Sequence, residues 1–222
     1  SGCSHPQLGR NYMIHLSPIA GGLFRQPTGA DETFVKQVGF ADYYLGGTAY
    51  PHKLGLIQSL PAPGPLMLRK TLPRFIPQRL LPFLRRHLLP LAGIVEDLPS
   101  RGNRVTPADG GKISVTHQFT AYDLERGQRM LRWMKQILRC AGALFSVGFA
   151  TPPRDHVAHQ CGTARFGSSE RVAPVAPDCR VFGIPNLFIV DGSIFPTSLG
   201  VGPALTIAAN ALRVARIVVG EA

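Results

Sequence analysis

The sequence predicts an α+β protein in which a largely antiparallel sheet carries helices on one face. Residues 19–60 alternate short apolar runs with turn signals, a pattern typical of three neighbouring antiparallel strands. Residues 94–119 hold two further strand candidates around polar turns, so we expect the sheet to continue through them. Residues 120–139 repeat apolar side chains at helical spacing, with Thr120 and Asp123 as a candidate N-terminal cap, and they predict one long amphipathic helix.

Composition indicates a chain that folds around a core of its own. Of the 222 residues, 45% are hydrophobic and 17% are charged, which excludes a mainly disordered protein. No apolar run reaches the roughly 18 residues that a membrane-spanning helix needs, and residues 1–15 lack the charged-then-apolar order of a signal peptide. We therefore expect neither a membrane span nor export, and a cytoplasmic location.

The net charge is strongly positive, because 24 Lys and Arg residues against 13 Asp and Glu residues give +11 at pH 7. Such an excess favours an acidic partner, but it is also the average surface of an arginine-rich chain. A nucleic-acid partner is not expected, since the sequence holds neither a recognisable DNA-binding motif nor a patch of interleaved basic and aromatic residues. The cysteines show no metal-site spacing, so we expect reduced thiols and no metal at Cys3, Cys140, Cys161 and Cys179.

Residues 61–90, which we call the basic flap, contain seven prolines. Prolines inside a helix interrupt it, so this stretch predicts short helical turns joined by bends. Six basic residues lie here among Leu and Phe, and no acidic residue occurs between Asp42 and Glu96. Two interpretations stay open: residues 66–89 contact a membrane surface or a partner, or the flap is solvated and its arginines lie along its own apolar side chains.

From about residue 149 the sequence differs in its residue pattern from the part before it. A polar, glycine-punctuated turn region precedes the run LFIV (187–190), which is predicted to be a buried strand that ends at Asp191. A glycine-rich loop that contains Gly202 then leads into a helix started by Pro203, a residue suited to a first helical turn. Such a loop offers backbone N–H groups and the positive end of the helix dipole to an anionic ligand.

Four segments together resemble the glucose-methanol-choline (GMC) oxidoreductase family of flavoenzymes. They occur in the family's order: LGRNYMIH (8–15), EDLPSRGNRV (96–105), HQCGTARFG (159–167) and RVFGIPNLFIVDGSIFPTSLGVGPALTIAANALR (180–213). The resemblance implies that residues 1–150, with the basic flap at 61–90, form a substrate-binding (cap) domain. It also implies that residues 151–222 are the catalytic, flavin-proximal segment, whose strand and helix complete an FAD-binding domain.

The resemblance further implies an activity, the oxidation of a CH–OH group of a small alcohol or sugar with hydride passing to N5 of FAD. His159 matches the family's catalytic histidine, which takes the hydroxyl proton, and imidazole suits that role because it is neutral near working pH. Asp191 and Gly192 match the strand end beside the cofactor. Gly202 and Pro203 match the start of the helix that faces the flavin pyrimidine ring.

The sequence departs from the family in two respects. Gly202 stands where the family has Asn or His, so no side chain completes a pair with His159; losing one positioned donor typically slows an enzyme by ~10² to 10³. The chain also lacks the G-x-G-x-x-G fingerprint that binds the FAD pyrophosphate on backbone amides. We therefore expect a second polypeptide that carries this half, and activity only in its presence; a truncated chain is the alternative.

Two classes of function follow. The first is a subunit or fragment of an FAD-dependent oxidoreductase in which His159 is the base. The alternative is a non-catalytic GMC-like structural or binding subunit, which Gly202 and the missing fingerprint both allow. His156 does not match the catalytic position, and we expect it at the surface or behind the site.

Overall fold

The computed structural model describes most of the chain, namely residues 5–32, 34–48, 50–151, 157 and 159–221. The chain forms two compact units, and neither is continuous in sequence. Unit 1 contains residues 1–15, 96–123 and 154–222, and unit 2 contains residues 16–95 and 124–153. These units group residues 1–15 and 96–123 with the C-terminal segment. The division at residue 150 into a substrate-binding and a flavin-proximal part stays a prediction about function.

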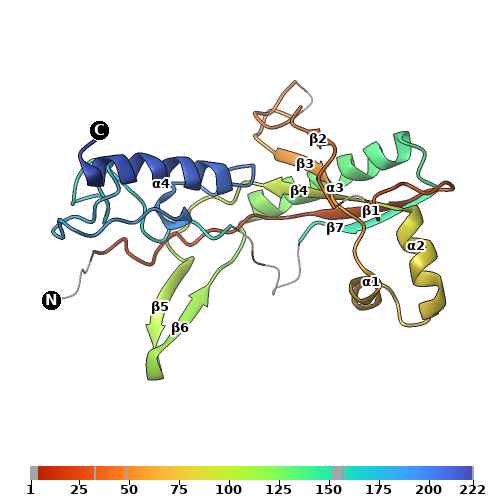
Figure 1. Ribbon diagram of the computed structural model, residues 1–222, viewed down its shortest axis with the longest axis horizontal. Helices are drawn as coiled ribbons and strands as arrows, with labels where there is room; N and C mark the ends of the chain where they lie inside the picture. The colour runs from red at the N-terminus through yellow and green to blue at the C-terminus, as the bar shows by residue number, and fades with distance from the viewer. Residues whose placement is uncertain (1–4, 33, 49, 152–156, 158, 222) are drawn as a thin grey trace. The chain divides into compact units, whose positions relative to one another are not determined.

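Unit 2 is built on a five-stranded sheet in which every pair of neighbouring strands is antiparallel (Figure 1). The predicted α+β class is therefore confirmed. The strands lie in the order β2-β3-β4-β1-β7. Their bounds are Ile19–Leu23 for β1, Gly39–Phe40 for β2, Gly55–Ser59 for β3, Leu88–Val95 for β4 and Phe145–Phe149 for β7.

The predicted amphipathic helix is present as α3 (Ala121–Cys140), and its part in unit 2 packs on one face of this sheet. Met130 and Met134 are fully buried and lie against Gly93 of β4, where an added Cβ would overlap the Met130 side chain. The predicted cap is also confirmed. The N–H of Thr120 donates to the Asp123 carboxylate at 2.9 Å, and the N–H of Asp123 donates to Thr120 Oγ1 at 3.2 Å.

The basic flap forms short helical turns, as predicted: α1 (Pro65–Thr71), the 3-10 turn η1 (Gln78–Leu80) and α2 (Leu81–His87). It ends earlier than expected, because Pro90 lies within β4, opposite Gly21 of β1. The carbonyl of Pro90 accepts a hydrogen bond from Leu60, just beyond the last residue of β3. A strand tolerates proline there because the missing N–H faces a side where strand pairing has ended. The described residues contain no helix that is long and apolar enough to cross a membrane.

The expectation that the sheet continues through residues 94–119 was wrong beyond β4. Strands β5 (Arg104–Ala108) and β6 (Lys112–Thr116) form a separate two-stranded hairpin in unit 1. The chain leaves the sheet where Asp97 is buried at 1% exposure and its N–H donates to Ser198 Oγ at 2.7 Å. The two later strands pair with each other, and β5 also makes an isolated bridge between Arg104 and Arg10 within unit 1.

The C-terminal helix α4 (Ala204–Val219) begins directly after Pro203 and confirms the predicted helix. The strand predicted at residues 187–190 is not formed. Phe188 makes one isolated bridge with Arg180, and Leu187 is 44% exposed. A strand needs a neighbouring strand to pair its backbone groups, and the described residues give this segment only that single bridge.

We expect the substitution Gly148→Ala to lower the free energy of unfolding by about 2 kcal/mol or more. A Cβ at this position of β7 would overlap the backbone of Ile19 in β1, so the two strands would have to move apart. Gly47→Ala is the control, because its added Cβ meets nothing within 4 Å. Chemical denaturation of the two variants measures the difference, and equal stabilities would contradict this account of the packing.

Candidate functional site

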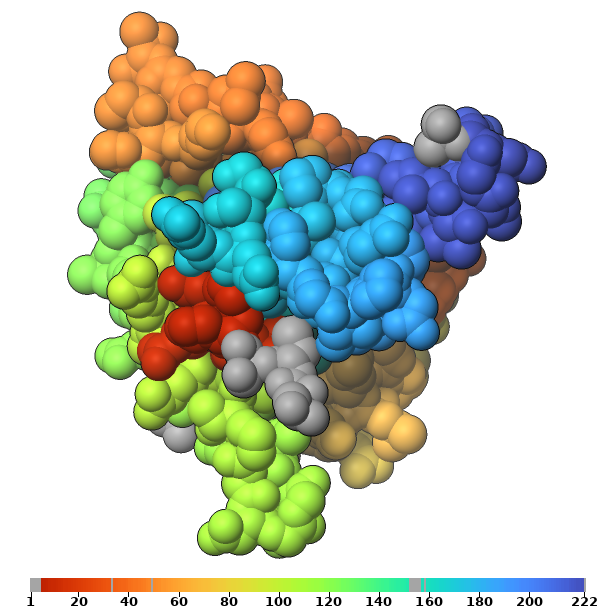
Figure 2. Space-filling model, turned by 90° about the vertical axis from the view of Figure 1, so that its left-hand side faces the viewer, coloured from red at the N-terminus to blue at the C-terminus, as the bar shows by residue number. Residues whose placement is uncertain are grey.

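The site is organised by an antiparallel contact between residues 9–15 and residues 159–163 of unit 1 (Figure 2, red beside cyan). The N–H of Met13 donates to the Cys161 carbonyl at 3.0 Å, and the N–H of Cys161 donates back at 2.9 Å. Gly162 permits the close approach, since its φ is 91° and a Cβ there would overlap the Asn11 carbonyl. In an antiparallel pair, residues two positions away from Met13 and Cys161 also face each other. His15 therefore lies opposite His159.

The two histidines are in contact through their rings. Nδ1 of His159 lies 3.0 Å from Nδ1 of His15, and Nε2 of His15 lies 2.6 Å from the carbonyl oxygen of Ser198. His15 is only 2% exposed, and burial lowers the pKa of its imidazole from 6.5 to about 4. The hydrogen bond to Ser198 opposes this shift, and His159 adds to it. His15 is therefore neutral near pH 7.

These contacts fix which nitrogen of each ring carries the proton. A carbonyl oxygen only accepts, so Nε2 of His15 must carry the hydrogen that it donates to Ser198. Nδ1 of the neutral His15 ring then carries a lone pair, and His159 must donate its Nδ1–H to it. The lone pair of a neutral His159 is consequently on Nε2, the nitrogen that a general base needs.

Asp97, in the motif segment 96–105, holds both Ser198 and the segment that contains His15 in place. The Asp97 carboxylate accepts hydrogen bonds from the N–H of Ile14 at 3.1 Å and from Nε2 of His117 at 2.7 Å. Burial raises the pKa of Asp97, and the hydrogen bond from His117 opposes this. Since the N–H of Asp97 also donates to Ser198 Oγ, all four segments that resemble the family meet in one hydrogen-bonded cluster.

Gly202 lies beside His159. A Cβ placed on Gly202 would be 3.6 Å from Cε1 and 3.9 Å from Nε2 of the His159 ring, within ordinary van der Waals contact. Pro203 is buried and caps α4, so the first N–H groups of this helix follow directly after Gly202 in the chain. These groups have no partner within the helix and carry its positive dipole end. Gly202 thus lies close to His159, and the cofactor-binding roles of Gly202 and Pro203 stay predictions.

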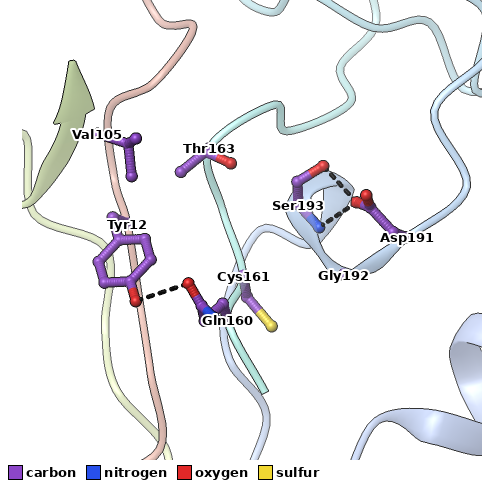
Figure 3. A pocket seen from close by; sticks show the side chains of 8 residues that line it. All are labelled: Tyr12, Val105, Gln160, Cys161, Thr163, Asp191, Gly192 and Ser193. Carbon is purple, nitrogen blue, oxygen red and sulfur yellow. Dashed lines mark hydrogen bonds between the residues drawn. The ribbon is translucent and has the colours of Figure 1, made fainter. Parts of the chain in front are cut away.

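Asp191 and Gly192 lie on a small pocket of about 290 Å³ (Figure 3). The Asp191 carboxylate accepts hydrogen bonds from the N–H and Oγ of Ser193, which fixes it at the start of the 3-10 turn η3 (Gly192–Ile194). Across the pocket, the Tyr12 hydroxyl donates to Gln160 Oε1 at 2.9 Å. His159 is not among the lining residues, but its neighbour Gln160 is.

Cys161 also lines this pocket. Burial raises the pKa of its thiol to about 11, and the nearby carboxylates of Asp191 and Asp97 add to the shift. The thiol is therefore protonated near pH 7 and is no nucleophile. Within the described residues no group of three or more His, Cys, Asp or Glu side chains is arranged to hold a metal ion.

Sequence reasoning pointed to His159, Gly202 and Asp191, but it missed His15, Asp97 and Ser198. All three are polar residues inside the quoted motifs, and this position in the motifs was the available signal. His156 and Cys3 lie outside the described residues.

Comparison with known proteins identifies the family of the chain. A sequence model of the GMC oxidoreductase family matches residues 99–211, about half of the chain. The chain therefore belongs to the GMC oxidoreductase family.

Individual relatives resemble different shares of the chain. It is 34% identical to paromamine 6'-oxidase of Streptomyces fradiae over 58% of its length, which is 25% of that protein. It is 26% identical to an uncharacterised GMC-type oxidoreductase of Mycobacterium tuberculosis over 95% of its length, which is 36% of that protein. The crystal structure of pyridoxine 4-oxidase from Mesorbium loti superimposes with a TM-score of 0.67 at 22% identity, covering 96% of this chain and 44% of that one. The chain thus spans less than half the length of each of these three proteins.

We expect His15 to make the stability of the fold depend on pH. Because its pKa is about 4 in the fold and near 6.5 when unfolded, the unfolded chain binds the proton first as the pH falls. The free energy of unfolding should therefore fall by up to about 3 kcal/mol between pH 6.5 and pH 4, and this contribution should be constant outside that window.

The measurement compares the unfolding free energy of the wild type with that of His15→Asn across this range. The raised pKa of Asp97 acts in the opposite direction, but both proteins share it, so it cancels in the comparison. Parallel pH profiles for the two proteins would show that His15 is not held neutral by the fold.

Proposed function

We propose that this chain is the catalytic, flavin-proximal part of an FAD-dependent oxidoreductase that oxidises a CH–OH group of a small alcohol or sugar. The observation that carries the proposal is the lone pair on Nε2 of His159, which the hydrogen bonds from His159 to His15 and from His15 to Ser198 direct there. The printed names of relatives, such as paromamine 6'-oxidase and cholesterol oxidase, support oxidase chemistry.

The residues present fit FAD. The first N–H groups of α4 carry partial positive charge, which stabilises an anionic ring edge by about 0.3–1 kcal/mol, or up to ~2 where it is partly buried. Gly202 has no side chain to block a planar ring, and it lies beside the proposed base. Asp191 and Gly192, which line the pocket together with Gln160, would contact the cofactor. When bound, FAD would supply the hydride acceptor.

The protein's own part in the reaction is to move one proton. Nε2 of His159 accepts the hydroxyl proton of the substrate, which makes the carbon a better hydride donor. The positive charge that then forms on His159 lies next to a neutral His15, whose Nδ1 keeps accepting the Nδ1–H. His15 is thus a positioning residue: it holds one tautomer of His159 and, being neutral, adds no repelling charge.

We further propose that α4 and residues 187–190 are covered by a dinucleotide-binding half, carried by a second polypeptide or by another part of the same one. The inner face of α4 contributes Val214 to the buried core of unit 1. Its outer face carries exposed apolar side chains, with Leu205 at 85% and Leu212 at 70%, one heptad apart. Such a stripe marks an interface when it stays uncovered.

The catalytic assignment is tested in the protein assembled with its flavin-binding half. We expect His159→Ala to lower kcat/KM by about 10² to 10⁴ while FAD content is unchanged, because a general base is worth that much. Flavin reduction under anaerobic conditions, with a panel of primary alcohols and sugars as probes, measures the rate. Unchanged turnover would instead favour the non-catalytic subunit.

Two substitutions separate positioning by His15 from simple packing. Asn at this position keeps an acceptor near the place of Nδ1, whereas Gln keeps only a donor near Ser198. We expect His15→Asn to keep more activity than His15→Gln, and the pH profile of kcat to change only in the Gln variant. Equal losses in both variants, with unchanged profiles, would assign His15 a purely structural role.

We also expect Gly202→Asn to raise kcat, by up to about 10²-fold, since one positioned donor is worth that much. The residue has no left-handed φ and an added Cβ has room, so the backbone accepts a side chain. Gly202→Ala is the matched control, because it adds the Cβ without a donor. A rate for the Asn variant no higher than that of the Ala variant would show that another group already supplies this hydrogen bond.

A further inference from the structure

We propose that the basic flap docks on the surface of an anionic lipid bilayer. Its apolar side chains point into solvent to an unusual degree. Leu66 is 85% exposed, Phe75 84% and Met67 64%, and Phe83 follows at 56%. Single exposed apolar residues are common, but four large ones within 18 residues form a patch that marks an interaction surface.

These side chains are not needed to hold the flap together. Each of its short helices has one buried residue, Leu68 in α1 and Leu81 in α2. The loop after α1 is closed by the Arg69 guanidinium, which donates to the carbonyls of Ile76, Leu72 and Pro73. These contacts stabilise the flap without its outer apolar residues, which remain exposed to a partner.

Charge identifies the kind of partner. Arg69 serves the flap itself, and Arg85 donates to the Asp31 carbonyl and lies 3.9 Å from its carboxylate. The other cations, Lys70, Arg74, Arg79 and Arg86, are exposed and make no ion pair among the described residues. The flap carries a net positive charge, because no acidic residue occurs from position 43 to 95 and the Asp31 carboxylate lies beside Arg85 alone among the ion pairs of the described residues. It would attract an anionic surface and repel a basic one.

A bilayer fits both properties at once. Phosphate headgroups lie within reach of arginine and lysine side chains while apolar tips enter the acyl boundary, as in interfacial amphipathic elements. A nucleic acid would satisfy the charges but leave Leu66 and Met67 in water. Along the flap, Phe75 and Phe83 lie between basic residues, and Leu66 and Met67 lie just before Lys70, so apolar and basic side chains are close together in the sequence.

The test is co-sedimentation of the full chain with vesicles. We expect binding to vesicles of phosphatidylcholine with about one third phosphatidylglycerol, none to pure phosphatidylcholine, and loss of binding as salt rises. Arg74→Glu with Arg79→Glu should weaken binding by at least about 10²-fold, since each lost charge is worth about five-fold and each reversal counts twice. Leu66→Ser with Phe75→Ser should weaken it to a similar extent.

Matched controls in unit 2 separate the patch from overall charge. Arg132→Glu with Arg139→Glu makes the same change of net charge on exposed residues of α3, and Leu45→Ser with Leu144→Ser removes similarly exposed apolar side chains. Both pairs should leave vesicle binding unchanged, and circular dichroism checks that all variants fold.

The proposal is overturned if the wild type does not bind anionic vesicles. That result would mean that another protein segment, and not a bilayer, covers the basic flap. It is also overturned if flap and control variants lose binding equally, because net charge alone then explains it. The outcome does not depend on the flavin chemistry, since His159→Ala should bind vesicles as the wild type does.

Discussion

The backbone pairing of Met13 with Cys161 is the contact on which the site depends. Two hydrogen bonds set the register, and the register alone puts His15 opposite His159. The pairing also holds His159 at a φ of 55°, a left-handed conformation that costs about 1–2 kcal/mol without glycine. A histidine keeps such a backbone only where its neighbours impose it, and strain of this kind gathers at functional sites.

Burial then decides which of the two histidines can act as a base. The low pKa of His15 keeps it neutral, so its two nitrogens have fixed and opposite roles: one donates to Ser198 and one accepts from His159. His159, in contrast, is exposed. The hydrogen bond from Asp97 holds Ser198, Ser198 holds the ring of His15, and His15 in turn orients the ring of His159. Because the His15 ring is neutral, it orients His159 without placing a charge beside it.

Sequence reasoning identified residues that match positions in the family's motifs. It missed residues whose neighbours become known only from the backbone pairing in the structure. His159 and Gly202 were found through the family resemblance, and the structure puts them together. His15 lay in a quoted motif but was not singled out, because nothing along the chain shows which residue it faces across the pairing. The strand at 187–190 was predicted from its apolar run, yet strand formation depends on a neighbour that a one-dimensional pattern does not contain.

In the proposed function, helix α4 would couple the chemistry to assembly with a flavin-binding half. Its first turn begins beside His159, its inner face is fixed through Val214, and its outer face carries Leu205 and Leu212 uncovered. Because a helix moves as one rigid element, a partner that covers the outer stripe also fixes the direction of the first N–H groups. In this proposal, cofactor binding and burial of Leu205 and Leu212 by the partner would stabilise the same position of α4. Because linked binding equilibria are reciprocal, binding of the cofactor would strengthen binding of the partner, and the reverse. On this argument an uncovered α4 leaves a base with the correct tautomer but a loosely held cofactor edge.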